Sequence, residues 1–217
     1  MTAALTFHPL TPERWPDLER LFGPNGAYSG CWCMFWRQTG PDWHDCDGAG
    51  RKRAFKAVCT KGERPPGVIA YRDGQPVGWV AIAPRADYVR LQHARVLVPI
   101  DDQPVWSITC FFIHRTARRQ GLMEKLIGAA VDFARGQGAT IVEAYPRPVT
   151  GKEASATLYV GTVSCFERAG FKVMARPSEK RAVMRKSIRR RRAKRVSNCA
   201  GSAAVLPARR DPRGTAG

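Results

Sequence analysis

The pattern of apolar, polar and helix-breaking positions changes at about residue 65. Before it, Thr11 followed by Pro12 marks a helix start, and Gly23-Pro24 marks a break. From Gly67 onwards, short apolar runs bounded by Gly, Pro and Asp are typical of strands and turns, and Asp73-Gly74 predicts a hairpin. The predicted elements are strand 5–10, helices 11–22 and 42–60, strands 68–71, 77–83 and 105–113, a helix from 122 to 136, strand 140–145, helix 161–169 and strands 171–175 and 181–186, with 87–93 as a strand or an irregular link.

The centre of the chain predicts a crossover unit. Val105–Ile113 is almost continuously apolar, as a central strand buried on both faces should be. A basic turn, a helix with apolar positions at 3–4 spacing and the strand Thr140–Tyr145 follow it. This order is that of a right-handed βαβ crossover. The predicted fold class is therefore α/β (α+β), with a mixed sheet and flanking helices.

The turn from Arg115 to Met123 combines features of an anion-binding site. It lies between a buried strand and a helix start, where unpaired backbone N–H groups and the helix dipole favour negative charge. Gly121 permits close approach of the backbone, and Arg118 and Arg119 add positive charge. An ordinary strand-to-helix turn with solvated arginines is the alternative, and the residues alone leave both interpretations open.

Two segments resemble a known family. Arg118-Arg119-Gln120-Gly121 resembles the acetyl-CoA motif of the GNAT superfamily, Arg/Gln-x-x-Gly-x-Gly/Ala, and Phe166-Glu167-Arg168-Ala169-Gly170-Phe171 resembles its later helix-to-strand element. The resemblance covers about residues 66–187. It implies a GNAT-like, mostly antiparallel sheet and an acetyl-CoA-dependent N-acetyltransferase whose amine acceptor attacks the thioester directly.

The resemblance also implies where acetyl-CoA binds. The strand at 106–113 is expected to splay away from the strand at 141–145, with the pantetheine arm between them and the pyrophosphate on the turn at 118–123. The cofactor-binding residues expected on this basis are Phe112, Ile113, Arg118, Arg119, Gln120, Gly121, Leu122, Met123 and Phe166.

The sequence departs from the family pattern at three positions. Met123 stands where Gly or Ala is usual, Phe166 where many members have a Tyr proposed as general acid, and Ser107 where some carry a carboxylate base. The alkylammonium form of the acceptor must still lose a proton. Glu143 is preferred as base because its strand should line the cleft, and a solvated or salt-bridged side chain is the alternative for every candidate. The candidates are Glu143, His114, Tyr159 and His93.

A thiol-rich and aromatic stretch precedes the strands. Cys31, Cys33, His44 and Cys46 offer a zinc set, but Cys-x-Cys is closer than the usual spacing and no second pair appears, so no metal is expected. The neighbouring aromatic residues are expected to form the acceptor pocket wall or the core beneath it: Trp32, Phe35, Trp36 and Trp43.

Positive charge is unevenly distributed between the body of the chain and its C-terminal residues. Residues 188–217 hold nine Lys or Arg and one acid, so they contribute +8 of the net +18 and leave +10 on residues 1–187. We expect an acetyltransferase domain at 1–187, with 1–65 as its helical, acceptor-side part, and a basic, disordered tail at 188–217. Seven cysteines without an export signal predict reduced thiols and a cytoplasmic protein.

The charge suits a polyanion, either CoA or nucleic acid. The favoured function is acetyl transfer to the primary amine of a small molecule, with an amine antibiotic as one candidate. A protein lysine or N-terminus as acceptor is an alternative. The rival from another class is a non-catalytic, basic nucleic-acid-binding protein, although the tail lacks the interleaved aromatic residues used for base stacking. Oligomeric state is not predicted.

Overall fold

The computed structural model describes residues 4–149 and 155–188 of the chain. Its strands form one seven-stranded sheet in the order β1-β2-β3-β4-β5-β7-β6. Every neighbouring pair is antiparallel except β4 and β5, which are parallel. This confirms the predicted mixed, mostly antiparallel sheet. The strands are β1 (Leu5–Pro9), β2 (Gly67–Arg72), β3 (Gln75–Pro84), β4 (Trp106–Ile113), β5 (Ile141–Ala144), β6 (Lys172–Ser178) and β7 (Arg181–Ser187).

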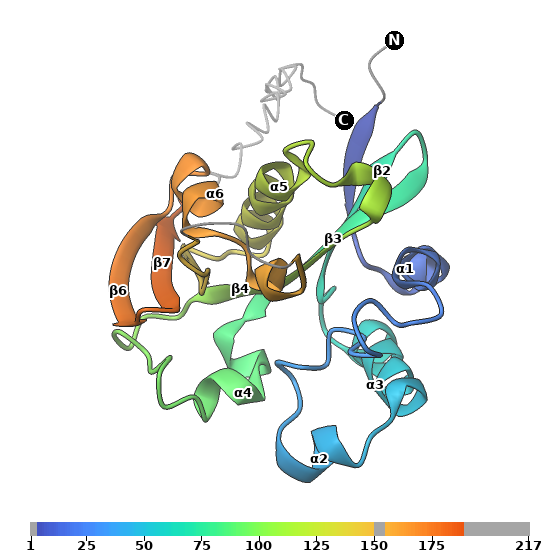
Figure 1. Cartoon of the computed structure of the whole chain (residues 1–217), viewed down its shortest axis with the longest axis horizontal. Helices are drawn as coiled ribbons and strands as arrows, with labels where there is room; N and C mark the ends of the chain where they lie inside the picture. The colour runs from blue at the N-terminus through green and yellow to red at the C-terminus, as the bar shows by residue number, and fades with distance from the viewer. Residues whose placement is uncertain (1–3, 150–154, 189–217) are drawn as a thin grey trace, which may run out of the picture.

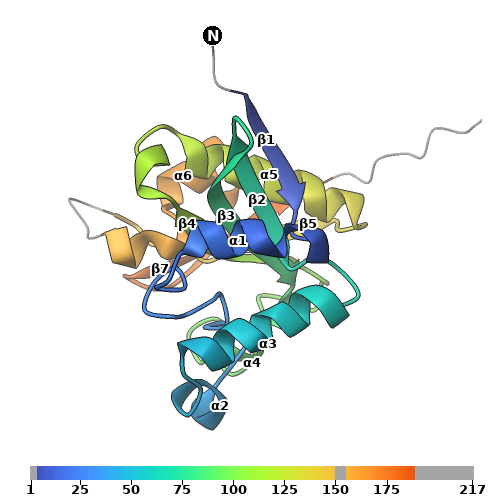
Figure 2. The same cartoon turned by 90° about the vertical axis from the view of Figure 1, so that its right-hand side faces the viewer.

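Helices cover both faces of the sheet (Figures 1 and 2), with α1 and α3 on one face and α5 and α6 on the other. No helix within the described ranges is long and apolar enough to cross a membrane. The α-helices are α1 (Trp15–Phe22), α2 (Gly40–His44), α3 (Gly48–Lys61), α4 (Val89–Gln92), α5 (Leu122–Gly136) and α6 (Val163–Arg168), and the 3-10 turns are η1 (Pro12–Arg14), η2 (Arg85–Asp87), η3 (Arg115–Ala117) and η4 (Ser155–Val160).

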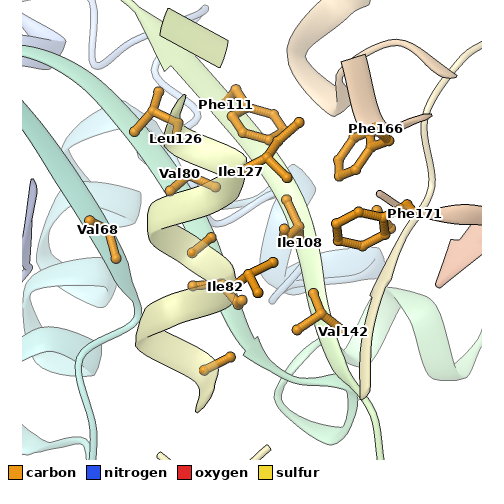
Figure 3. Close-up of a cluster of buried hydrophobic side chains, with 14 of the residues drawn as sticks. Val68, Val80, Ile82, Ile108, Phe111, Leu126, Ile127, Val142, Phe166 and Phe171 are labelled. Carbon is orange, nitrogen blue, oxygen red and sulfur yellow. The ribbon is translucent and has the colours of Figure 1, made fainter. Parts of the chain in front are cut away.

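The central strands are buried on both faces because each face packs against helices. Val80 and Ile82 of β3 join Leu126 of α5 in one hydrophobic cluster, which Figure 3 shows around that helix. Trp79, which directly precedes Val80 in the strand, points to the opposite face and packs against Phe55 of α3. Strands of this kind show continuous apolar runs, as the sequence of this region does.

The predicted elements are present, with two differences. The helix expected at 42–60 is divided into α2 and α3, because the Asp47 carboxylate accepts a hydrogen bond of 2.6 Å from the Gly50 N–H and starts a new helix. Residues 85–92 form short helical turns, η2 and α4, where a strand or an irregular link was predicted for 87–93.

The crossover from β4 through α5 to β5 creates an opening in the sheet. Only Trp106–Ile108 of β4 pair with Val142–Ala144 of β5. From Thr109 to Ile113, β4 continues without a partner among the described strands on this side. The two parallel strands therefore diverge, as the resemblance implied.

The last described residue packs into the core. The Ile188 side chain is buried, and its N–H donates to the Thr140 carbonyl at 2.8 Å. The remainder of the basic tail, residues 189–217, lies outside the described residues, so the division of the chain into a domain and a tail stays a prediction.

Candidate active site

A cleft of about 1010 Å³ lies where β4 loses its partner. Four segments that are distant in the sequence line it: residues 27–43, the end of β4, the turn leading into α5, and η4 with α6. The lining residues are Ala27, Tyr28, Ser29, Cys31, Cys33, Phe35, Trp36, Trp43, Cys110, Phe111, Phe112, Ile113, Ala117, Arg118, Arg119, Gly121, Leu122, Met123, Leu158, Tyr159, Thr162, Cys165 and Arg168.

The backbone of the basic turn is arranged to receive an anion. Arg119 and Gly121 both have left-handed torsions, with φ of 58° and 70°. Gly121 is the N-cap of the fifteen-residue helix α5. Within the described structure, no residue accepts a hydrogen bond from the N–H groups of residues 118–123. These unpaired donors and the N-terminal end of the helix dipole meet at one point of the cleft.

The side chains of the turn divide into those that face the cleft and one that does not. Arg118 and Arg119 line it, and the Arg118 Nε also donates to the Ile113 carbonyl at 3.0 Å, which ties the turn to the end of β4. The Gln120 side chain folds back on the turn, donating to the Thr116 carbonyl at 3.0 Å, and is not part of the lining. Seven of the nine residues expected to bind acetyl-CoA line the cleft: Phe112, Ile113, Arg118, Arg119, Gly121, Leu122 and Met123.

Phe166 belongs to the core and not to the cleft lining. Its side chain is fully buried, and its ring centroid lies 5.0 Å from that of Phe171 and 6.1 Å from that of Phe111 (Figure 3). The other face of α6 points to the cleft through Cys165 and Arg168. Sequence reasoning missed these two residues: their i, i+3 spacing places them on one face of the helix but does not show that this face meets the cleft.

Glu143 also lies outside the cleft lining. Its carboxylate is 1% exposed and pairs with the guanidinium groups of Arg85 at 3.1 Å and Arg185 at 2.6 Å. The Tyr145 hydroxyl donates to the same carboxylate at 2.5 Å and lies 2.8 Å from Ser107 Oγ. A buried carboxylate that accepts hydrogen bonds from two arginines and a tyrosine is suited to holding strands together.

The two histidine candidates do not line the cleft, whereas Tyr159 does. His114 caps η3 and contacts the Thr116 hydroxyl through Nδ1 at 2.8 Å, and His93 is exposed at the end of α4. Burial raises the pKa of the Tyr159 phenol, so this side chain stays protonated at neutral pH.

The part of the cleft built by residues 27–43 is aromatic. The Phe35 ring makes edge-to-face contacts with Trp36 at 5.3 Å, Trp43 at 5.5 Å and Tyr159 at 6.2 Å. This places Phe35, Trp36 and Trp43 on the expected pocket wall, whereas Trp32 lies in the core beneath it.

Three cysteines that line the cleft, Cys31, Cys33 and Cys110, lie beside the aromatic wall. Cys33 Sγ lies 3.9 Å from Cys110 Sγ and accepts a hydrogen bond of 2.9 Å from the Trp79 indole. Burial raises the pKa of the Cys31 and Cys33 thiols, which keeps them protonated. Among the described residues, no three His, Cys, Asp or Glu side chains are grouped as metal ligands, and this includes the set from Cys31 to Cys46.

The described residues fit acetyl-CoA. The edge of β4 that faces away from β3, from Thr109 to Ile113, has no partner strand in the described structure and offers hydrogen bonds to an amide-containing arm, as a neighbouring strand would. The turn at 118–123 offers N–H donors and arginine charge to a pyrophosphate. The cleft is large enough for this arm together with a second substrate.

Comparison with known proteins agrees with this geometry. The family model described as the acetyltransferase (GNAT) family matches residues 29–171. No curated protein matches the chain. Similar solved structures include an aminoglycoside acetyltransferase AAC(6') in complex with coenzyme A (18% identity, 85% of this chain and 95% of that chain, TM-score 0.51).

Two further structures share the fold at low identity. One is a putative GNAT acetyltransferase from Desulfovibrio desulfuricans (15% identity, 85% and 99% of the two chains, TM-score 0.50). The other is an N-acetyltransferase from Staphylococcus aureus (11% identity, 85% and 98%, TM-score 0.50). Because the family model covers more than half of the chain, the protein belongs to the GNAT family of acetyl-CoA-dependent N-acetyltransferases.

Proposed function

We propose that this acetyltransferase acts on the primary amine of a small molecule. The observation that carries the proposal is that one cleft has two chemically different parts, a basic turn with free N–H donors and a wall of aromatic rings. Concave sites with apolar walls and few polar groups are typical of small-molecule pockets. Phe35 and Trp43 bind the body of the acceptor, and its amine is directed towards β4.

The residues of the basic part hold the cosubstrate. The backbone of β4 beyond Ile108 pairs with the pantetheine arm, and the N–H groups of residues 119–123 bind the pyrophosphate. Bound acetyl-CoA supplies a thioester carbonyl that an amine attacks. Arg118 and Arg119 contribute charge at the same place.

Tyr159 is the side chain we assign to proton transfer. Its phenol lines the cleft and its pKa is raised, so it is a proton donor towards a departing thiolate and not a base. Glu143 is assigned a structural role, because two arginines and a tyrosine occupy its carboxylate. The described lining residues include no His, Asp or Glu, so we propose that the amine binds as the free base.

The binding part of the proposal is tested by calorimetric titration of CoA into variants of Gly121. Asp at this position places a carboxylate against the pyrophosphate and should weaken binding at least about a hundredfold, because one buried like-charge contact costs several kcal/mol. Asn has the same shape and tolerates left-handed torsions, so Gly121→Asn isolates the effect of charge.

Gly128→Asp is the second control. Gly128 is exposed on α5 and an added Cβ there meets no atom within 4 Å, so this variant adds the same charge to the same helix away from its N-terminus. It should bind CoA as the wild type does. Equal affinity of Gly121→Asp and Gly121→Asn would contradict the placement of the pyrophosphate.

The antibiotic and protein acceptors stay predictions. The aminoglycoside acetyltransferase structure is 18% identical in sequence to this chain, which establishes the common fold and not the acceptor. Free-thiol release with acetyl-CoA separates the candidates: a panel of small amines should support turnover, whereas peptides with a free N-terminus or lysine should not. Turnover with peptides alone would overturn the small-molecule proposal.

A further inference from the structure

The aromatic part of the cleft is backed by positive charges of the chain itself. The guanidinium carbon of Arg51 lies 4.0 Å from the ring centroid of Trp43, and that of Arg90 lies 4.2 Å from the ring centroid of Phe35. Aromatic rings attract cations through their faces. Here one face of each ring is already covered by an arginine, so the rings are poorly placed to bind a second cation.

These two arginines are held by backbone carbonyl groups. Arg51 donates to Trp43 O at 3.0 Å and to Gly30 O at 3.3 Å, and Arg90 donates to Phe35 O at 2.6 Å. In the part of the chain that the structure describes, neither guanidinium forms an ion pair with a carboxylate. Their charge is therefore not neutralised locally, and the potential behind the aromatic wall is positive.

The charged side chains that line the cleft are also positive. Its charged members within residues 4–149 and 155–188 are Arg118, Arg119 and Arg168, and only Arg168 has a carboxylate partner, Glu124 at 2.8 Å. No aspartate or glutamate of the described ranges belongs to the lining. A further positive charge on an acceptor, beyond the reacting amine, would thus find no carboxylate among the described side chains that line the cleft.

The segment that forms the aromatic part is held in a strained conformation. Four non-glycine residues within seven positions have left-handed torsions: Ala27, Ser29, Trp32 and Cys33, with φ between 41° and 70°. Such torsions cost about 1–3 kcal/mol each and persist where the surrounding structure enforces them, typically at functional sites. The Trp32 ring, stacked on Trp15 at 6.1 Å, anchors this segment to the core.

We infer that the acceptor is an aromatic monoamine: one primary amine attached to an aryl-bearing group, with no second positive charge. This inference rests on the proposed function of the same cleft. The aryl group packs against the edges of Phe35 and Trp43, and the amine enters uncharged. In the transfer, the amine nitrogen forms a bond to the acetyl carbon. The carbon–sulfur bond breaks, and its electron pair stays on the sulfur of CoA. The nitrogen loses one proton and the thiolate gains one, so protons balance. Polycationic acceptors, aminoglycoside antibiotics among them, do not fit.

The test compares three amines on the CoA-saturated protein by calorimetry, so that binding is read without turnover. The amines are 2-phenylethylamine, 2-cyclohexylethylamine and spermidine. We expect 2-phenylethylamine to bind at least about tenfold more tightly than spermidine, because like charges placed together cost several kcal/mol. It should bind about threefold more tightly than the cyclohexyl analogue, since edge-to-face contacts add about 0.5–1.5 kcal/mol. The kcat/KM values from thiol release should follow the same order.

A charge variant tests the cause of this selectivity. Ser29 is exposed, lines the cleft and precedes Gly30, whose carbonyl binds Arg51. Ser29→Asp adds a carboxylate at a left-handed position that Asp tolerates, and should improve spermidine binding about fivefold. Ser29→Asn, which matches its shape, should keep the wild-type preference.

The outcomes separate this inference from the function on which it rests. If the protein transfers acetyl groups but binds spermidine as tightly as 2-phenylethylamine, the assignment of an aromatic monoamine as acceptor is wrong. The proposal of a small-molecule acetyltransferase would still hold in that case. Equal effects of Ser29→Asp and Ser29→Asn would overturn the electrostatic cause of selectivity. Failure of CoA to bind the wild-type protein would overturn both proposals.

Discussion

At the scale of single residues, Glu143 shows what a sequence cannot reveal. The sequence identified the carboxylate at position 143 and predicted that it lies in a short strand of the crossover. Its partners are 58 and 42 positions away, and only the packing of η2 and β7 around β5 brings Arg85 and Arg185 to it. Its environment, and hence its role, depends on tertiary contacts that no local pattern encodes.

Glu143→Gln should therefore affect stability more than catalysis. Removing this charge leaves two arginines facing a neutral amide and should lower the free energy of unfolding by about 3 kcal/mol or more. Glu19→Gln is the control, because Glu19 pairs with Lys52 at 2.8 Å at the surface and should cost at most about 1 kcal/mol. Urea unfolding measures both. A Glu143→Gln protein of wild-type stability with strongly reduced turnover would restore Glu143 as the base.

Tyr159 gives the second prediction at this scale. Tyr159→Phe keeps the ring that packs against Phe35 and removes the proton donor, so turnover should fall about tenfold while CoA affinity is unchanged. Because the folded-state pKa is raised, the protonated form persists at neutral pH and is lost only above the ordinary value of about 10. The wild-type rate should accordingly show no descending limb below pH 9. A Tyr159→Phe protein that turns over at the wild-type rate would contradict this assignment.

At the scale of elements, local signals located almost every helix and strand, and the division of the helix predicted at 42–60 has a local cause. Residues 42–60 were predicted as one helix, yet the chain turns between His44 and Gly48. Asp47 caps the second helix, and an Asp at this position is a sequence signal for a helix start. The break matters for function, because it allows Arg51 of α3 to lie over Trp43 of α2.

Asp47→Ala should lower the free energy of unfolding by about 1 kcal/mol, since it leaves an N–H at the start of α3 without its acceptor. Asp47→Asn retains a capping oxygen and should cost only a few tenths of that. Thermal unfolding monitored by circular dichroism compares the two variants. If both destabilise equally, the charge of Asp47, and not its capping bond, supports the helix.

At the scale of the whole molecule, the sequence predicted the elements and the crossover, and the family resemblance supplied the splayed strands. The site itself is assembled from segments separated by more than a hundred positions, such as Phe35 and Tyr159. Hydrophobic spacing cannot show which distant segments meet. It also cannot show which face of a helix such as α6 meets the cleft, since that is set by the packing of Phe166 into the core.

Hydrogen exchange with and without CoA tests the central claim, that the gap beside β4 and the turn at its end hold the cosubstrate. CoA should slow exchange of the backbone amides between Thr109 and Ile113 that face away from β3, and of those between Arg119 and Met123, because these groups lack partners in the described structure and gain them on binding. Amides of β6 and β7 should exchange at unchanged rates. Unchanged exchange in both β4 and the turn at saturating CoA, or protection confined to other elements, would contradict the account.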